Sequence, residues 1–269
     1  MDNWEGQLDR ISVAELCALL NSGTTTARGL TEACFRQINN FDDRVNAVIE
    51  RNPEALAIAD ERDAERRLGA TRGPMHGLPV MIKDNIDTGD CMATTGGSLA
   101  LVGAPAPKDA FIVDRLRKAG LVIIGKTNLS EWANFRATKS SSGWSSRGGQ
   151  TRNPYALDRT PGGSSSGSGV AVACGFTPFA VGTETDGSIL VPAAMNGIVG
   201  IKPTVGLVSR SGIIPISHRQ DTAGPMARSV ADAAALLTVL AATDPEDTAT
   251  TGSRLIPDYM TFLDKSGLK

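Results

Sequence analysis

Short apolar runs alternate with helical patterns from Gly77 onward. The run LPVMIK ends in Lys83, the run LVIIG begins at Leu121, and a third covers residues 179–183. Apolar runs of this length, bounded by glycine and polar residues, are typical of buried strands. Strands separated by helices indicate a sheet with helices on its faces. The sequence therefore predicts an α/β fold.

The first 70 residues carry helical patterns instead. Ser12 and Glu15 form a capping-box pair, and Asn52 followed by proline resembles a cap with a first-turn proline. The expected helices cover residues 13–20, 27–38 and 54–68. They predict an N-terminal helical layer over residues 1–70, ahead of the α/β core over residues 71–269 of a single larger domain.

Further helices are expected between the apolar runs of the core. Asp109 is expected to cap the helix AFIVDRLRKAG, which ends at Gly120. GVAVACG, at residues 169–175, fits a strand by composition or a buried helix by its small residues, and we favour the helix. A last helix is expected from Ser229 to Leu240.

The composition indicates a globular protein without a polyanionic partner. The chain has 269 residues, of which 41% are hydrophobic and 21% charged, and a formal net charge of −2. It has no cluster of lysine and arginine, so nucleic-acid binding is not expected. No apolar run reaches the length of a membrane span, and the first residues lack a signal-peptide pattern. We therefore expect a cytoplasmic protein with no membrane partner.

The four cysteines do not form a metal or disulfide pattern. Cys17, Cys34, Cys91 and Cys174 are far apart in the sequence, with no CxxC pair among them. A metal site or a dense disulfide framework needs closer spacing. We predict four buried thiols and no metal site.

Two glycine-serine segments adjoin apolar runs: PGGSSSGSG at residues 161–169 and GTETDGS at residues 182–188. A flexible linker would have polar flanks, which these segments lack. A phosphate-binding loop would need a third glycine in place of Val172, or a GK[ST] ending. Both interpretations are therefore disfavoured.

The letters at residues 163–167 also spell the GxSxG of a nucleophile elbow, and Asp186 and His218 follow in the order acid, histidine. A turn, ALDRTPGG, precedes these serines, whereas an elbow leaves a strand. The sequence has only two histidines, His76 and His218, and a lone histidine is more often structural than catalytic. The elbow is therefore the weaker interpretation.

A neutral lysine can replace histidine as the base that activates a serine. Lys83 ends an apolar strand, where burial lowers the pKa of an ammonium group. The competing interpretation is that Lys83 reaches solvent or pairs with Asp84 or Asp87. The pattern alone leaves both open.

Several segments in this order resemble one known family. GLPVMIKDN, GKTNLSEWANF, GGSSSGSG, GTETDGS and PAAMNGIVGIKPT are similar to the amidase signature family of serine hydrolases, and the likeness extends to about Asp244. It is strongest to bacterial members that remove the C-terminal amide of peptides. The resemblance implies an amidase signature fold, with a mixed central β-sheet flanked by helices on both faces, and an amidase without a cofactor.

The resemblance also implies a Ser-cisSer-Lys triad. By the family motifs Lys83 is the base, Ser164 the bridging serine after a cis peptide bond, and Ser188 the nucleophile that attacks the carboxamide. The family separation of the two serines selects Ser164 rather than its serine neighbours. Gly162 and Gly163 are structural loop residues that permit close backbone packing.

The resemblance further implies that the oxyanion is held by backbone N–H groups of the loop Thr185, Asp186, Gly187 and Ser188. Asp186 stands where most of the family has glycine. Its carboxylate is suited to orienting a substrate amine, orienting Lys83, or capping the helix expected at SILVPAAMNG. The sequence leaves these three roles open.

Two weaker features accompany this site. Trp132 and Phe135, at helical spacing in GKTNLSEWANF, fit either the border of an active site or the core. His218 and Arg219 are candidates for contact with a peptide or small-molecule amide.

Family members continue well beyond LDKSGLK, so the fold looks truncated. We expect an uncovered sheet edge to favour self-association or a partner chain that supplies the missing half. Three functions follow. They are an amide hydrolase, a catalytically inactive or split component of an assembly, and an ammonia donor of the amidotransferase type.

Overall fold

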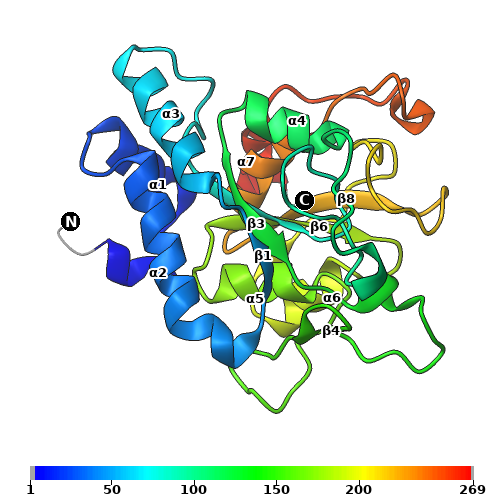
Figure 1. The fold of residues 1–269 in the computed structure, drawn as a ribbon. Helices are drawn as coiled ribbons and strands as arrows, with labels where there is room; N and C mark the ends of the chain where they lie inside the picture. The colour runs from blue at the N-terminus through cyan, green and yellow to red at the C-terminus, as the bar shows by residue number, and fades with distance from the viewer. Residues whose placement is uncertain (1–3, 268–269) are drawn as a thin grey trace.

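A six-stranded mixed sheet runs through the centre of the computed structural model, which describes residues 4–267 (Figure 1). The strand order is β1-β3-β2-β6-β8-β7. The strands are β1 Val48–Arg51, β2 Pro79–Lys83, β3 Val122–Thr127, β6 Phe179–Glu184, β7 Val199–Gly200 and β8 Thr222–Ala227. β2 is parallel to β3 and to β6, and the other pairs are antiparallel. A separate hairpin is formed by β4 Trp144–Ser145 and β5 Gly149–Gln150.

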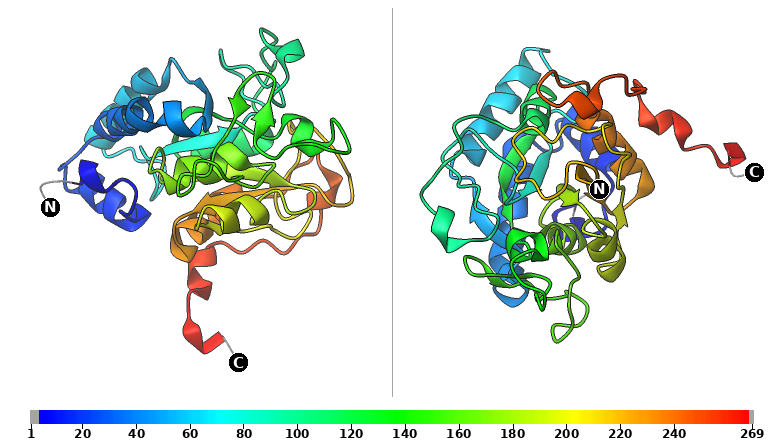
Figure 2. Two further views of the ribbon diagram at one scale, coloured as in Figure 1. Left: turned by 90° about the horizontal axis from the view of Figure 1, so that it is seen from below. Right: turned by 90° about the vertical axis from the view of Figure 1, so that its right-hand side faces the viewer.

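Helices cover both faces of the sheet, which confirms the predicted fold class. They are α1 Val13–Asn21, α2 Ala27–Val45, α3 Ala55–Arg67, α4 Phe111–Lys118, α5 Ser166–Ala173, α6 Leu190–Met195 and α7 Val230–Leu240. Figure 1 shows α4 and α7 on one side of the central strands and α5 and α6 on the other. Beyond α7 the chain returns to this helix, where the N–H of Tyr259 in the 3₁₀ turn Tyr259–Phe262 donates to Thr238, and only the last described residues extend outward (Figure 2).

The residues of β2 alternate between two apolar clusters. Val80 and Ile82 belong to the cluster that holds residues of α1, α4 and α7. Met81 belongs to the cluster that holds residues of α3 and α5. Because side chains alternate along a strand, Lys83 points to the same face as Met81, toward α5.

The capping prediction for the first helix is confirmed, since Ser12 and Glu15 form the reciprocal capping box of α1. The second helix is longer than predicted and reaches Val45, which is buried. Asn46, with φ of 55°, then ends α2 in the left-handed conformation. Asn52 is not the cap of α3, because its side chain accepts the N–H of Glu54 in a turn before the helix.

Among the core helices, α5 confirms the helical interpretation of GVAVACG, and α7 confirms the predicted last helix, which Ser229 caps. Asp109 does not cap α4, which begins after Ala110. Its carboxylate instead accepts hydrogen bonds from the Gly89 N–H and from Arg117.

Three strands of the central sheet were not predicted from the sequence. β1 lies within the first 70 residues and forms the edge of the sheet beside β3, so this part of the chain contributes a strand as well as helices. β7 has two residues, and β8 reads TAGPMA, with one β-branched residue. Short strands without a run of β-branched or aromatic residues lack a clear local signal.

The prediction of four buried thiols is wrong for Cys91, which is exposed in the loop after β2. All four cysteines are free, Cys34 is buried, and Cys17 and Cys174 are partly buried. Burial raises the pKa of Cys34 and of Cys174 to about 12. Between residues 4 and 267, the helices are too short or too polar to cross a membrane.

Candidate active site

Lys83, the last residue of β2, is fully buried. Its Nζ lies 2.7 Å from Ser164 Oγ, 2.9 Å from Thr183 Oγ1 and 3.3 Å from the Thr183 carbonyl oxygen. Burial lowers the pKa of Lys83 to about 7, although Glu184 and Asp221 act in the opposite direction. Lys83 thus combines contact with a serine and a lowered pKa.

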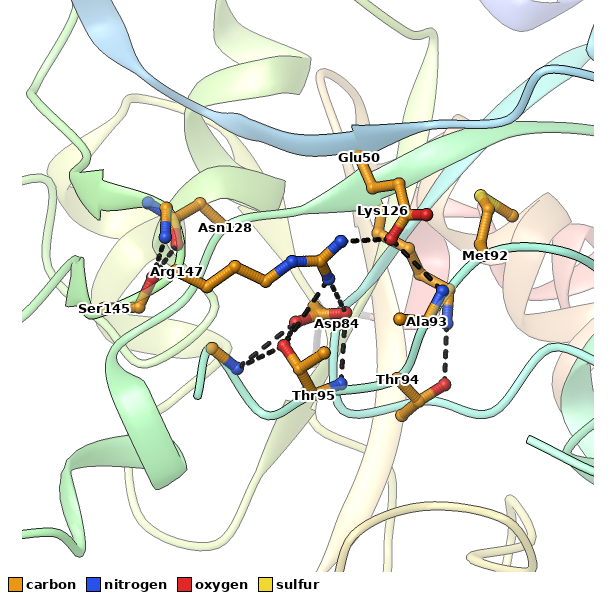
Figure 3. Close-up of polar contacts among 12 residues, drawn as sticks. Glu50, Asp84, Met92, Ala93, Thr94, Thr95, Lys126, Asn128, Ser145 and Arg147 are labelled. Atoms are coloured by element: carbon orange, nitrogen blue, oxygen red, sulfur yellow. Dashed lines mark hydrogen bonds and ion pairs between the residues drawn. The ribbon is translucent and has the colours of Figure 1, made fainter. Parts of the chain in front are cut away.

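Asp84 belongs to a different buried cluster (Figure 3). Its carboxylate accepts hydrogen bonds from the Thr95 hydroxyl, the Gly97 N–H and the Arg147 guanidinium. Arg147 also pairs with Glu50 of β1. Because Lys83 is fully buried, the alternative that it extends to solvent is wrong. Within residues 4–267 it forms no ion pair with Asp84 or with Asp87.

The segment before α5 brings Ser164 to Lys83. The Gly163–Ser164 peptide bond is cis, as the family resemblance implied. A Cβ on Gly163 would lie 2.4 Å from Ser130 Oγ, and a Cβ on Gly167 would lie 2.3 Å from the Ala47 carbonyl oxygen. Only glycine fits such contacts. Glycine at these positions therefore permits the close packing of this segment against its neighbours.

Ser188 is 8% exposed in the loop that follows β6. Its carbonyl oxygen accepts the Ser165 N–H at 3.1 Å, which joins the two glycine-serine segments directly. Gly162, which has φ of 71°, packs against α6 after this loop, since a Cβ there would lie 3.0 Å from Val191. The structure therefore brings the backbone of the second segment against the first.

Glu184, at the end of β6, organises the same loop and was missed by sequence reasoning. Its buried carboxylate accepts N–H groups from Gly187 at 3.0 Å, Ile189 at 2.7 Å and Leu190 at 2.9 Å. It therefore performs the capping considered for Asp186, whose side chain is exposed. Because Gly187 donates to Glu184, the predicted oxyanion site depends on the other N–H groups of the loop.

Removal of this carboxylate should destabilise the protein. Glu184→Ala leaves three N–H groups without their acceptor, and we expect it to lower the free energy of unfolding by about 3–5 kcal/mol. Asp186→Ala, at an exposed position in the same loop, should change it by less than about 0.5 kcal/mol. Denaturant unfolding measures both, and equal losses would contradict the assigned role of Glu184.

Asp221 also supports the loop without having been predicted. The Thr185 hydroxyl donates to Asp221 at 2.6 Å. The other carboxylate oxygen of Asp221 accepts the N–H groups of Ile216 and Ser217, both at 2.8 Å. Asp221 therefore joins the loop after β6 to the segment that forms the wall of two cavities.

These two cavities meet at Asn85. The first has a volume of about 390 Å³, and its polar lining includes Thr183, Arg210 and His218. The second has a volume of about 300 Å³ and is mainly apolar. Residues Asn85, Ile214, Pro215 and Ile216 line both. Ser188 and Arg219 are in neither lining, so His218 is the better of the two weaker substrate-contact candidates.

Trp132 and Phe135 line the second cavity. Trp132, Ala133 and Asn134 have φ values of 50°, 53° and 73°, so this segment is a left-handed turn and not a helix. Trp132 and Phe135 both line the cavity, and Phe135 is 68% exposed. Their interpretation as core residues is therefore wrong, because helical spacing does not apply to a left-handed turn.

The elbow interpretation receives no support. No strand leads into residues 163–167. The hydroxyl of Ser165 donates to the Thr183 carbonyl at 3.1 Å and accepts the Thr183 N–H at 3.2 Å, which is a structural role. His76 is buried against the Arg62 carbonyl, at 2.8 Å from its Nε2.

Comparison with known proteins agrees with this geometry. The family model named Amidase matches residues 29–265. Native peptide amidase from Stenotrophomonas maltophilia is 58% identical with a TM-score of 0.94, over 97% of this chain and 54% of that structure. A probable amidase of Arabidopsis thaliana is 47% identical over 97% of this chain and 52% of its own length. A glutamyl-tRNA(Gln) amidotransferase subunit of Halorhodospira halophila is 44% identical over 95% of this chain and 51% of its own length.

The sheet order, the flanking helices and the buried lysine beside a cis-linked serine define a fold of the amidase-signature class. The chain belongs to the Amidase family. It spans about half the length of the relatives that it matches.

Proposed function

We propose that the chain carries the catalytic residues of an amide hydrolase that deamidates carboxamides, above all the C-terminal amides of peptides. The observation that carries the proposal is the fully buried Lys83, whose Nζ lies 2.7 Å from Ser164 Oγ. Family membership and 58% identity to a peptide amidase support it. In this proposal Lys83 is the base, Ser164 is the bridging serine and Ser188 is the nucleophile.

The contacts of Lys83 indicate the direction of proton transfer. The Thr183 carbonyl oxygen can only accept a hydrogen bond, and Thr183 Oγ1 is a second oxygen at 2.9 Å. A neutral amine has two N–H groups for these two oxygens. Its lone pair is then free for the hydroxyl proton of Ser164, which can in turn take the proton of Ser188.

The chemical steps follow from this relay. The Ser188 oxygen attacks the carboxamide carbon while its proton passes through Ser164 to Lys83. Lys83 then passes this proton to the substrate nitrogen, the C–N bond breaks, and ammonia leaves. Water hydrolyses the remaining acyl-enzyme along the same relay. The N–H groups of Thr185, Asp186 and Ser188 stabilise each oxyanion, since that of Gly187 is held by Glu184, and the scheme uses no cofactor.

A second candidate is an ammonia donor that passes its product to another site. The 44% identity to a glutamyl-tRNA(Gln) amidotransferase subunit favours it. This function shares the first chemical step and differs in the fate of ammonia.

Ammonia release from a panel of peptide amides tests the proposal, on the protein as its gene encodes it. Wild type should release ammonia and peptide acid in equal amounts. Ser164→Ala should lower kcat by about 10²- to 10⁴-fold, because the relay is broken. Ser166→Ala is the matched control, since Ser166 Oγ donates to the Gly162 carbonyl and does not contact Lys83. Equal effects of both variants would contradict the bridging role, and ammonia from glutamine alone would favour the second candidate.

A further inference from the structure

The geometry points to Asn85 as the residue that recognises the nitrogen of the scissile carboxamide. We infer that its side-chain oxygen accepts a hydrogen bond from the substrate –NH₂ and so selects amides over the matching esters. The inference rests on the proposed function, because it concerns the leaving group of the same reaction.

Asn85 has one side-chain atom without a partner. The residue is 5% exposed and lines both cavities. Its Nδ2 donates to Thr183 Oγ1 at 2.9 Å, whereas Oδ1 is buried and has no hydrogen-bond partner in the described part of the chain. Buried polar atoms are nearly always paired, because an unpaired one loses its water without compensation. A free acceptor where two cavities meet is therefore suited to a donor that arrives with the substrate.

Asn85 lies close to Lys83, the proposed base. Thr183 Oγ1 contacts both Asn85 Nδ2 and Lys83 Nζ, each at 2.9 Å. Asn85 is thus connected to the base through one shared hydroxyl. The leaving nitrogen receives a proton from Lys83, on this side of the site, while the oxyanion donors belong to the loop after β6. A carboxamide needs donors at its oxygen and acceptors at its nitrogen, and the two sides of the site supply them separately.

The backbone holds Asn85 in place. Its carbonyl oxygen accepts the Ile214 N–H at 3.0 Å. On one side Asp84 is fixed in the buried cluster of Figure 3. On the other side the Ile86 carbonyl accepts a hydrogen bond from Lys126 at 2.6 Å. An acceptor fixed in this way need not reorganise when substrate binds, which favours discrimination.

An ester has no N–H to offer this acceptor. Its alkoxy oxygen would face Oδ1 with no proton between them, and Oδ1 would remain unpaired. Sites built to bind a hydrogen-bonding group reject analogues that lack it much more strongly than apolar sites reject a missing methylene. The structure therefore predicts a preference for amides that depends on Asn85.

The test compares kcat/KM for a peptide amide and for its methyl ester, using the protein as its gene encodes it. Because esters are intrinsically more reactive, the amide-to-ester ratio is compared between variants. Asn85→Leu has a similar volume and no polar atom, and it should lower the ratio by about 10- to 100-fold, the value of one or two such hydrogen bonds. Asn85→Asp keeps an acceptor oxygen and should keep the amide-to-ester ratio of kcat/KM. The pH optimum of this variant should be higher, because a nearby carboxylate raises the pKa of Lys83 and so favours its ammonium form.

Asn196→Leu is the matched control. Asn196 is also buried, and its Oδ1 has no hydrogen-bond partner among residues 4–267, but its Nδ2 donates to the Pro161 and Pro192 carbonyls and it lines neither cavity. Any loss of kcat/KM in Asn196→Leu should be equal for the amide and the ester. An unchanged ratio in Asn85→Leu would overturn the inference alone, whereas wild type that hydrolyses neither substrate would overturn the proposed function. Should Asn85→Leu fail to fold, a ratio lowered in Asn85→Asp would also overturn the inference.

Discussion

Ser188→Ala is expected to lower kcat for a peptide amide by about 10⁴-fold or more, because the variant has no oxygen to form the acyl-enzyme. The loop should remain folded, since the contacts that hold it use the Ser188 carbonyl and the Glu184 carboxylate and not the serine hydroxyl. Ammonia release measures the loss, and mass spectrometry of the quenched wild-type reaction should show an acyl adduct that the variant lacks.

His218→Ala provides the comparison for Ser188→Ala. His218 lines the first cavity on an exposed loop, so its removal should affect KM and leave kcat within about threefold, as for most exposed substitutions. A large loss of kcat in His218→Ala, together with an active Ser188→Ala, would favour the histidine-dependent elbow and contradict the proposed triad.

Lys83→Met is expected to abolish turnover while making the protein more stable at pH 7. Burial lowers the pKa of Lys83 to about 7, so wild-type kcat/KM should rise with pH and reach half of its plateau near pH 7. Below that pH the lysine is an ammonium group that cannot accept a proton. The measurement is the pH profile of kcat/KM, and a profile that is flat from pH 5 to 9 would contradict a lysine base.

The stability of Lys83→Met should depend on pH in a defined direction. The pKa of Lys83 is about 7 in the folded protein and 10.5 for an ordinary lysine. Between these values the unfolded state binds one more proton than the folded state, so wild-type stability rises with pH across this window. The advantage of Lys83→Met in thermal unfolding should therefore be largest at or below pH 7 and decrease above it. An advantage that grows with pH would contradict a buried, neutral lysine.

The sequence predicted the elements whose signal is local. β2 is a continuous apolar run and α1 begins with a capping box, so both could be recognised without knowledge of their neighbours. β8 consists mainly of small residues and is a strand because it pairs with β6 along its whole length. Its conformation depends on tertiary contacts that the local sequence does not encode.

The candidate site divides in the same way. Motifs identified Lys83 and Ser164, and the structure places them in contact. Thr183, which contacts Lys83 although it is 100 positions away, could not be found from spacing alone. Glu184 ends an apolar strand, and its capping role becomes visible only when the following loop folds back onto it.

The close packing of α5 against its neighbours has a consequence for protein engineering. A Cβ on Gly167 would lie 2.3 Å from the Ala47 carbonyl oxygen and 2.5 Å from that of Asn128, so this helix touches its neighbours backbone to backbone. Libraries that randomise the glycines around it should return almost only parental sequences. Variation aimed at new substrates is better placed at Phe135 and His218, where a new side chain meets open space and the protein can tolerate the change.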